Sequence, residues 1–362
     1  MKILHVINSL KFGGAESLLT ELLPLINKEA DIELLVLDYD EYDEFTLKLL
    51  NKGVKLIPLK IKGGVYNPLL IFKITSIIRK YQLVHVHLFP SLYWVALANL
   101  FNRTKSTLIF TEHSTNNKRR DKLVFKILDK YIYSQYKTVI CISEATRINL
   151  CKHLNRTSGI VKIENGINLA AYNNTLPFHR ENLNLKDDDV ILLQVASFRL
   201  AKDQDTVIRA IKLLPDRVKL LFAGEGDRIN ICKELVSDMS LNHRVHFLGN
   251  RSDVPSLLAM CDIVVMSSNY EGFGLAAVEG MASNKPVIAS NVEGLSQVVI
   301  EAGLLFDKGD ETMLAKQIES LINDEQFYSR ISCKCKSRAE EYNIDLMVKK
   351  YLSLYRSFDF NS

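Results

Sequence analysis

The stretch from Ser267 to Val299, SSNYEGFGLAAVEGMASNKPVIASNVEGLSQVV, constrains the fold of this chain more than any other. A short run rich in β-branched residues, 263–267, precedes its glycine turn, and a second such run, 286–290, follows. The segment 275–283 between them predicts a helix. Strand, glycine turn, helix and strand make a βαβ unit, whose parallel strands are buried on both faces. Ligands of such sheets bind beyond the carboxyl ends of the strands, which is where the glycine turn lies.

The residues of this turn favour a diphosphate as ligand. The glycines of the Gly-Phe-Gly sequence let the backbone approach a ligand without a Cβ clash. The amides of Phe273, Gly274 and Leu275 open the predicted helix, where the positive end of its dipole favours an anion. Glu279 lies one turn beyond Leu275 on the same face, so its carboxylate can accept hydrogen bonds from a ribose diol. Glu271 precedes the helix and should contact whatever lies beyond the phosphates. A capped helix with one surface Glu is the simpler alternative.

Strand and helix patterns alternate along the whole chain, which predicts an α/β protein. The length of 362 residues suggests two domains. We predict the first domain at residues 1–172 and the second at 190–343. The polar segment 173–189 between them is interpreted as a linker. A final helix is expected within 344–362.

The organising stretch resembles the donor-site signature of retaining GT-B glycosyltransferases of family 4. That signature has a Glu, a Gly-aromatic-Gly, a second Glu eight residues after the first, then Lys-Pro-Val and a Gly turn. Here it corresponds to Glu271, Gly272-Phe273-Gly274, Glu279, Lys285-Pro286-Val287 and Gly294, while Gln297 stands where the family often has Glu. The resemblance implies two Rossmann-like doubly wound domains facing a central cleft, with the terminal helix returning to the first domain.

Two cations follow the predicted strand 190–195. Arg199 and Lys202 would lie at a strand-to-helix turn, where they can neutralise a leaving diphosphate without a metal. The family usually has its Arg five residues before the Lys, where Ser197 stands here, so Lys202 fits the pattern and Arg199 is a substitute. Gly224 resembles the family's glycine turn after the second strand of the donor domain.

In the first half, Gly13 and Gly14 follow a predicted strand. A simple turn is one interpretation, and the resemblance implies a loop that faces the cleft. His113 lies just beyond the carboxyl end of the predicted strand 107–111 and resembles the family's cleft histidine, which lies near the donor sugar. His85 and His87 lie on one face of a strand. No third metal ligand is evident near them, so a packed strand is favoured over a metal site.

The net charge of +4 is too small to indicate a nucleic-acid partner. Lys and Arg outnumber Asp and Glu by 24 to 15 in residues 1–172, whereas Asp and Glu outnumber them by 27 to 22 in the remainder. This basic half fits an acidic substrate, an anionic membrane surface or plain solubility. The predicted helix 117–137 carries much of the charge. It could lie on a membrane as an amphipathic helix or present a solvated basic face. Its basic residues are Lys118, Arg119, Arg120, Lys122, Lys126 and Lys130.

The six cysteines have no paired spacing and the first residues read as a strand rather than a signal peptide, so we expect a cytoplasmic protein. Peripheral contact at the inner membrane face is one option.

From these features we predict a retaining glycosyltransferase that moves a sugar from a nucleotide-diphosphate donor, expected to be UDP-linked, to a lipid-linked or saccharide acceptor in surface polysaccharide biosynthesis. No cofactor or metal is expected to be required. A sugar-nucleotide epimerase of GT-B fold and a non-catalytic nucleotide-sugar-binding subunit are the alternatives. The residues do not fix the sugar, the base or the acceptor.

Overall fold

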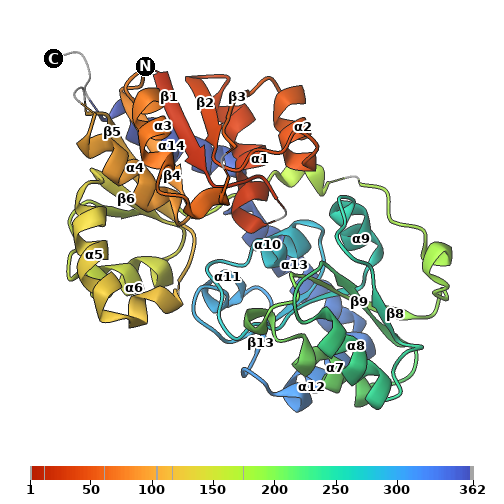
Figure 1. Ribbon diagram of the computed structural model, residues 1–362. Coiled ribbons are helices and arrows are strands. Elements are labelled where there is room, and N and C mark those ends of the chain that lie inside the picture. The colour runs from red at the N-terminus through yellow and green to blue at the C-terminus, as the bar shows by residue number, and fades with distance from the viewer. Residues whose placement is uncertain are drawn as a thin grey trace. The chain divides into compact units, whose positions relative to one another are not determined.

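The computed structural model describes residues 2–11, 13–60, 62–102, 105–115, 117–173 and 175–358. The chain divides into two compact units (Figure 1). Unit 1 comprises residues 1–166 together with 344–362, and unit 2 comprises residues 167–343. Each unit contains a parallel β-sheet with helices, which confirms the α/β class.

Unit 1 has, within its described residues, a seven-stranded sheet of order β3-β2-β1-β4-β5-β6-β7. All its strand pairs are parallel, and the central strands are almost wholly buried because helices cover both faces. The order of the strands reverses between β1 and β4. The elements are β1 (Lys2–Ile7), α1 (Gly14–Ile26), β2 (Asp31–Val36), α2 (Glu44–Asn51), β3 (Lys55–Pro58), α3 (Leu70–Ile78), β4 (Leu83–His87), α4 (Ser91–Leu100), β5 (Thr107–Glu112), η2 (Lys118–Asp121), α5 (Leu123–Ser134), β6 (Thr138–Cys141), α6 (Glu144–Leu154) and β7 (Ile160–Lys162).

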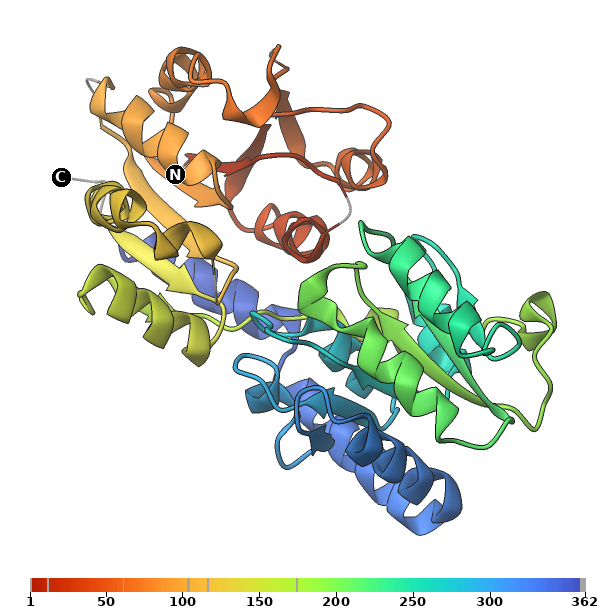
Figure 2. The same ribbon diagram turned by 60° about the horizontal axis from the view of Figure 1, so that its bottom comes forward.

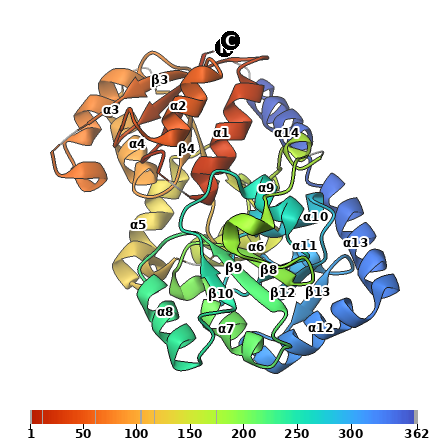
Figure 3. The same ribbon diagram turned by 90° about the vertical axis from the view of Figure 1, so that its right-hand side faces the viewer.

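The last helix of the described chain, α14 (Ile344–Arg356), belongs to unit 1 and packs against α1 (Figure 3). Its apolar positions recur at helical spacing, so that one face enters the core. Tyr351 and Tyr355 on that face are fully buried, although each carries a hydroxyl group. Their hydroxyl groups bond to polar side chains of the sheet, as expected for buried polar atoms.

Unit 2 has, again within the described residues, a six-stranded parallel sheet of order β10-β9-β8-β11-β12-β13. Its order reverses between β8 and β11. Helices α12 and α13, drawn in blue, lie side by side (Figure 2). Helix α13 also packs on α10. The elements are β8 (Val190–Val195), η5 (Leu200–Lys202), α7 (Gln204–Lys212), β9 (Val218–Ala223), α8 (Ile229–Asp238), β10 (Val245–Phe247), α9 (Val254–Met260), β11 (Ile263–Met266), α10 (Leu275–Ala282), β12 (Val287–Ser290), α11 (Ser296–Val299), β13 (Leu304–Phe306), α12 (Glu311–Asn323) and α13 (Glu325–Glu340).

The segment 167–189, which the sequence assigned partly to the first domain and partly to a linker, belongs to unit 2 and contacts the rest of that unit. The backbone N–H of Phe178 donates to the carbonyl oxygen of Ser256 at 3.0 Å. The guanidinium of Arg180 pairs with the Asp262 carboxylate at 3.3 Å. These bonds tie the segment to α9 and to the start of β11.

Candidate active site

Two loops of unit 2 converge where the strand order reverses, between β8 and β11. Neighbouring strands at such a point send their connections to opposite faces of the sheet, which opens a crevice beyond their carboxyl ends. The loop after β11 holds the loop after β8 directly. The side-chain amide of Asn269 donates to the carbonyl oxygen of Leu200 at 2.7 Å, and its backbone N–H donates to that of Ala201 at 2.8 Å.

These loops bring together Lys202 and Glu271, which lie 69 positions apart in sequence. The Lys202 ammonium pairs with the Glu271 carboxylate, and the two side chains are only 22% and 16% exposed. The carbonyl oxygen of Lys202 accepts hydrogen bonds from Ser267 Oγ at 3.1 Å and from Gln194 Nε2 at 3.2 Å. The other Glu271 oxygen accepts the N–H of Gly272 at 3.1 Å. Contacts within the protein therefore hold both charged groups in place.

The glycine turn has the backbone that its sequence requires. Gly274 has φ of 93° at the N-cap of α10, a conformation that residues with a Cβ rarely adopt. Gly294 has φ of 83°, and a Cβ there would lie 2.3 Å from the carbonyl oxygen of Glu271. The Phe273 side chain is buried edge-on against Tyr342, with ring centroids 5.2 Å apart. Phe273 thus anchors the turn through its ring and can meet a ligand only through its backbone.

Glu279 lies on α10, one turn after Leu275, and both residues are half-buried. Burial raises the pKa of the Glu279 carboxyl, and a hydrogen bond with Tyr172 opposes that shift. Tyr172 follows η3 (Leu169–Ala171), in a segment for which no site residue was predicted. Tyr172 therefore orients the Glu279 carboxylate, and part of the Glu279 side chain is still accessible to solvent.

The remaining predicted residues of unit 2 differ in their surroundings. Arg199 precedes η5 and its side chain is exposed. Gly224 has φ of 144°, and a Cβ there would lie 2.2 Å from the carbonyl oxygen of Ala196. The N–H of Gly224 donates to the carbonyl oxygen of Gly249 at 2.7 Å. Gly224 therefore lets the loops after β8, β9 and β10 pack closely, and a ligand contact by it stays a prediction.

In unit 1, Gly13 and Gly14 are exposed at the start of α1. Gly13 is extended, with φ of −175°, so its backbone conformation does not itself require glycine. His113 follows β5 and is half-buried, and its Nε2 lies 3.3 Å from Nδ1 of His87. Burial lowers the pKa of His113 to about 4, which makes the ring neutral at neutral pH.

His5, His85 and His87 bring three ring nitrogens within 4.8 Å of one another and are the candidate metal ligands among the described residues. His5 is the third member that the sequence did not reveal. It lies on β1, whose parallel pairing with β4 sets it directly beside His85.

Comparison with known proteins identifies the family. Residues 177–338 match the family Glycosyl transferases group 1, and residues 12–171 match Glycosyltransferase Family 4. An uncharacterized glycosyltransferase from Methanocaldococcus jannaschii is 30% identical over 346 residues, which cover 91% of this chain and 92% of that protein. The chain belongs to glycosyltransferase family 4. Membership of this family confirms that it is an enzyme of the hexosyltransferase type.

Two further similarities bear on this family 4 glycosyltransferase. HepE from Anabaena, solved in complex with UDP and glucose, superposes with a TM-score of 0.88 at 22% identity, covering 99% of this chain and 100% of that one. This likeness confirms the GT-B fold class. An N-acetylgalactosamine-N,N'-diacetylbacillosaminyl-diphospho-undecaprenol 4-alpha-N-acetylgalactosaminyltransferase from Campylobacter jejuni is 22% identical over 355 residues, 93% of this chain and 94% of that protein.

The predicted basic helix of the glycosyltransferase needs correction. The segment forms the short η2 and then α5, rather than one helix from 117 to 137. Arg119 and Arg120 do not present a basic surface, because their side chains are only 9% exposed and pair with Asp129 and Glu112. The Glu112 carboxylate also accepts from the Tyr133 hydroxyl at 2.6 Å. These buried pairs attach α5 to the sheet.

The outer side of α5 is apolar. Residues at positions i, i+1, i+4, i+5 and i+8 share one side of a helix. On α5 that side carries large hydrophobic side chains that are 38–72% exposed, namely Leu123, Val124, Ile127, Leu128 and Tyr131. Exposed lysines, one turn apart, border it at Lys122, Lys126 and Lys130. Within the described residues, no helix has both the length and the apolar character that a membrane span requires.

Proposed function

We propose that this glycosyltransferase moves a sugar from a UDP-linked donor to a lipid-linked saccharide, with retention of the anomeric configuration, in surface polysaccharide biosynthesis. The observation that carries the proposal is the fixed Lys202–Glu271 pair beside the amino end of α10, at the point where the strand order of unit 2 reverses. HepE, which shares this fold, was solved with UDP and glucose, and that likeness supports UDP as the nucleotide.

The donor diphosphate binds to positively charged side chains and to backbone amides of unit 2. Lys202 and the exposed Arg199 neutralise the charge that develops on the leaving diphosphate. The first amides of a helix have no acceptor within the helix, so those of Phe273, Gly274 and Leu275 are suited to the phosphate oxygens. Because Lys202 and Arg199 supply positive charge, we propose that the reaction needs no metal ion.

The two acids hold the sugars at either end of the diphosphate. Glu279, four residues along the same helix face as Leu275, accepts hydrogen bonds from the ribose hydroxyls. Glu271, before the helix, holds hydroxyls of the transferred sugar and so fixes its anomeric carbon for attack. Gly13, Gly14 and His113 of unit 1 and Gly224 of unit 2 are proposed to contribute further substrate contacts.

Glu271 is already paired with Lys202, so it is better suited to orient the sugar than to attack it. We therefore propose substitution on one face of the sugar. The bond from the anomeric carbon to the diphosphate oxygen breaks as the acceptor oxygen bonds to that carbon. The acceptor proton passes to the departing phosphate oxygen. Atoms and charge balance without an additional nucleophile or metal.

For the acceptor we propose a lipid-linked saccharide reached at an anionic membrane surface. The Campylobacter relative is named for an undecaprenyl-diphosphate substrate, which supports this class. The exposed apolar side of α5 and its border of lysines have the composition of a helix that lies in the membrane interface. Lysines beside buried apolar side chains attract anionic headgroups.

Transfer assays with labelled UDP-sugars and a lipid extract test the function. We expect a labelled lipid product with the wild type. Lys202→Ala and Glu271→Ala should each lower kcat by about 10²- to 10³-fold while the fold survives, because each removes stabilisation of the departing charge or of the sugar. Lys316→Ala, which removes an exposed lysine of α12, is the control and should retain full activity.

Four outcomes contradict the proposal or a part of it. An epimerised free nucleotide sugar would indicate the epimerase alternative, and binding without any product would indicate a non-catalytic subunit. Wild-type rates in Lys202→Ala would remove the proposed role of the ion pair. A chelator such as EDTA should leave the rate unchanged, and loss of activity with it would overturn the metal-free mechanism.

A further inference from the structure

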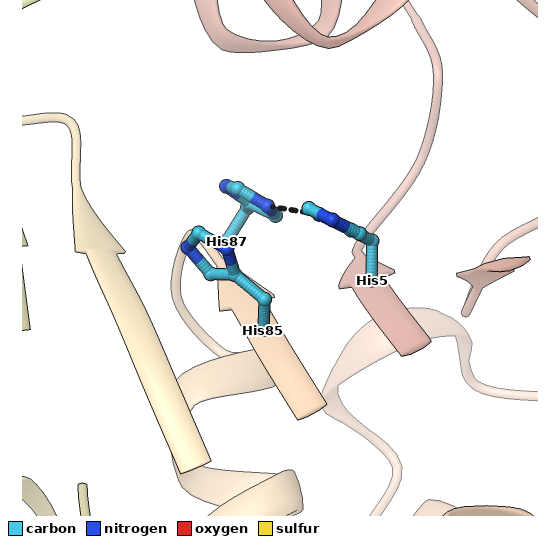
Figure 4. Close-up of side chains that lie close together, drawn as sticks. All are labelled: His5, His85 and His87. Atoms are coloured by element: carbon cyan, nitrogen blue, oxygen red, sulfur yellow. Dashed lines mark hydrogen bonds between the residues drawn. The ribbon is translucent and has the colours of Figure 1, made fainter. Parts of the chain in front are cut away.

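Three histidine rings and one tyrosine hydroxyl in unit 1 form a continuous chain of hydrogen-bonding distances. Nδ1 of His5 lies 3.1 Å from Nε2 of His87, and the dashed line in Figure 4 marks this bond. On its other side, Nδ1 of His87 lies 3.3 Å from Nε2 of His113. At the far end, Nε2 of His5 lies 3.4 Å from the Tyr355 hydroxyl of α14. His85 lies alongside and meets that same hydroxyl through its Nδ1 at 2.6 Å.

The ring geometry does not favour a metal ion at this cluster. Imidazole lone pairs lie in the plane of the ring, so three ligands of one ion must aim their planes at a common point. The rings of His85 and His87 are instead stacked, with centroids 4.4 Å apart and planes 27° apart. Both nitrogens of His85 already have hydroxyl partners, Tyr355 at 2.6 Å and Thr111 at 2.7 Å. The hydrogen-bonded chain accounts for all of these contacts.

Each ring in this chain is neutral. Burial lowers the pKa of His5 to about 3 and that of His87 well below its ordinary value, and the neighbouring imidazoles lower that of His87 further. A neutral imidazole has one N–H and one lone pair. Because His5 and His87 use both nitrogens within the chain, every bond must point in the same direction. The direction at Tyr355 therefore determines which nitrogen of His113 carries the proton.

The shortest bond sets that direction. A phenol hydroxyl is a stronger acid than a neutral imidazole N–H, so Tyr355 donates on its 2.6 Å bond to His85. The Tyr355 oxygen then accepts from Nε2–H of His5. His5 Nδ1 accepts from His87 Nε2–H, and His87 Nδ1 accepts from His113 Nε2–H. His113 is left with its lone pair on Nδ1.

We propose that His5, His87 and Tyr355 are positioning residues that hold His113 as its Nε2–H tautomer, with the Nδ1 lone pair accepting a hydrogen bond from a substrate hydroxyl. The inference rests on the proposed function, because a sugar supplies the hydroxyl donor. It goes beyond that function by naming the tautomer and three buried residues, none of which needs to touch the substrate.

Nitrogen-15 NMR of the histidine-labelled enzyme tests the tautomer without any activity measurement. The wild type should show His113 with a protonated Nε2 and an unprotonated Nδ1. Tyr355→Phe removes only the hydroxyl and should release the chain, so that His113 populates both tautomers. A His113 protonated on Nδ1 in the wild type, or a signal unchanged in Tyr355→Phe, would overturn the proposal. Addition of Zn²⁺ should leave the spectrum unchanged, and shifts of the three cluster histidines with it would favour a metal site instead.

Kinetics separate this inference from the proposed function. His87→Leu should lower kcat about tenfold with little change in the donor KM, because His113 loses its orienting partner but not its ring. His87→Asn keeps an amide at the Nδ1 position and should recover part of the loss. If the wild type transfers no sugar, the proposed function fails. If the wild type is active and His113→Asn impairs it, but His87→Leu and Tyr355→Phe match the wild type, only the inference fails.

Discussion

Lys202 and Glu271 form an ion pair that neutralises both charges, and this pairing shapes how a nucleotide would bind. Both side chains are mostly shielded from water, so their interaction is screened less than a surface pair. In the proposed mechanism, an incoming diphosphate competes with the Glu271 carboxylate for the Lys202 ammonium. The carboxylate that it displaces is then available to the sugar hydroxyls. Binding of the diphosphate to Lys202 is thus linked to release of Glu271.

Glu271→Gln should therefore have opposite effects on binding and turnover. Without the carboxylate, Lys202 is free for the diphosphate, and UDP should bind about two- to fivefold tighter, or roughly 0.5–1 kcal/mol. The kcat should fall, because the amide holds the sugar hydroxyls less strongly than a carboxylate. Isothermal titration with UDP and steady-state kinetics measure the two quantities. UDP affinity that fell along with kcat would show that Glu271 does not compete for Lys202.

Glu279 should make nucleotide affinity depend on pH. Burial raises the pKa of this carboxyl, so it takes up a proton at a higher pH than an ordinary glutamate. The protonated form is the poorer acceptor for ribose hydroxyls. UDP affinity should therefore be constant above the raised pKa and fall as the pH decreases through it. Titrations between about pH 5 and pH 8 measure this, and Glu279→Gln should give weaker binding without that pH dependence.

At the scale of single residues, the sequence predicts which side chains lie close together only within one local motif. Glu271, Gly274 and Glu279 could be assigned roles because one turn and one helix place all three. The sequence could not show that Tyr172 meets Glu279, because a hydrogen bond between distant segments leaves no periodic pattern. The same holds for His5, which reaches the other histidines only through the pairing of β1 with β4.

The elements around the glycine turn were predicted closely. The observed α10 and β12 begin and end within one residue of the predicted bounds, because β-branched runs and glycines mark those boundaries clearly. The segment from 117 to 137 was predicted less well. A count of basic residues does not show that Arg119 and Arg120 are used in buried ion pairs. The charge available at the surface is thus smaller than the sequence suggests, and the apolar area is larger.

The outer side of α5 should determine membrane binding. A Val124→Glu, Ile127→Glu double variant places acids among the exposed apolar side chains and should lower binding to phosphatidylglycerol vesicles at least tenfold, since each apolar side chain contributes about 1.5–3 kcal/mol when fully buried. Vesicle sedimentation measures the effect. Leu213→Glu, at an exposed leucine in unit 2, is the matched control and should bind as the wild type does. Equal binding of the double variant would exclude α5 as the contact.

On the scale of the whole molecule, the main groups that we propose to bind the nucleotide belong to a single unit. Lys202, Glu271 and Glu279 all lie in unit 2, which is continuous in sequence from 167 to 343 and has its own core. A fragment of these residues should unfold cooperatively in urea and bind UDP with an affinity close to that of the full chain, but it should transfer no sugar. A folded fragment that failed to bind UDP would show that groups of unit 1 are essential for the nucleotide.

The place of α14 in unit 1 has a consequence for how the protein is made. The ribosome completes unit 2 when it adds Asn343, whereas unit 1 still lacks the helix that supplies Tyr351 and Tyr355 to its interior. The N-terminal unit, although translated first, is therefore the second to acquire all its parts. Until then His85 and Thr111 lack their tyrosine partners. A nonsense codon just after residue 343 would therefore damage unit 1, although the codon itself directly follows unit 2.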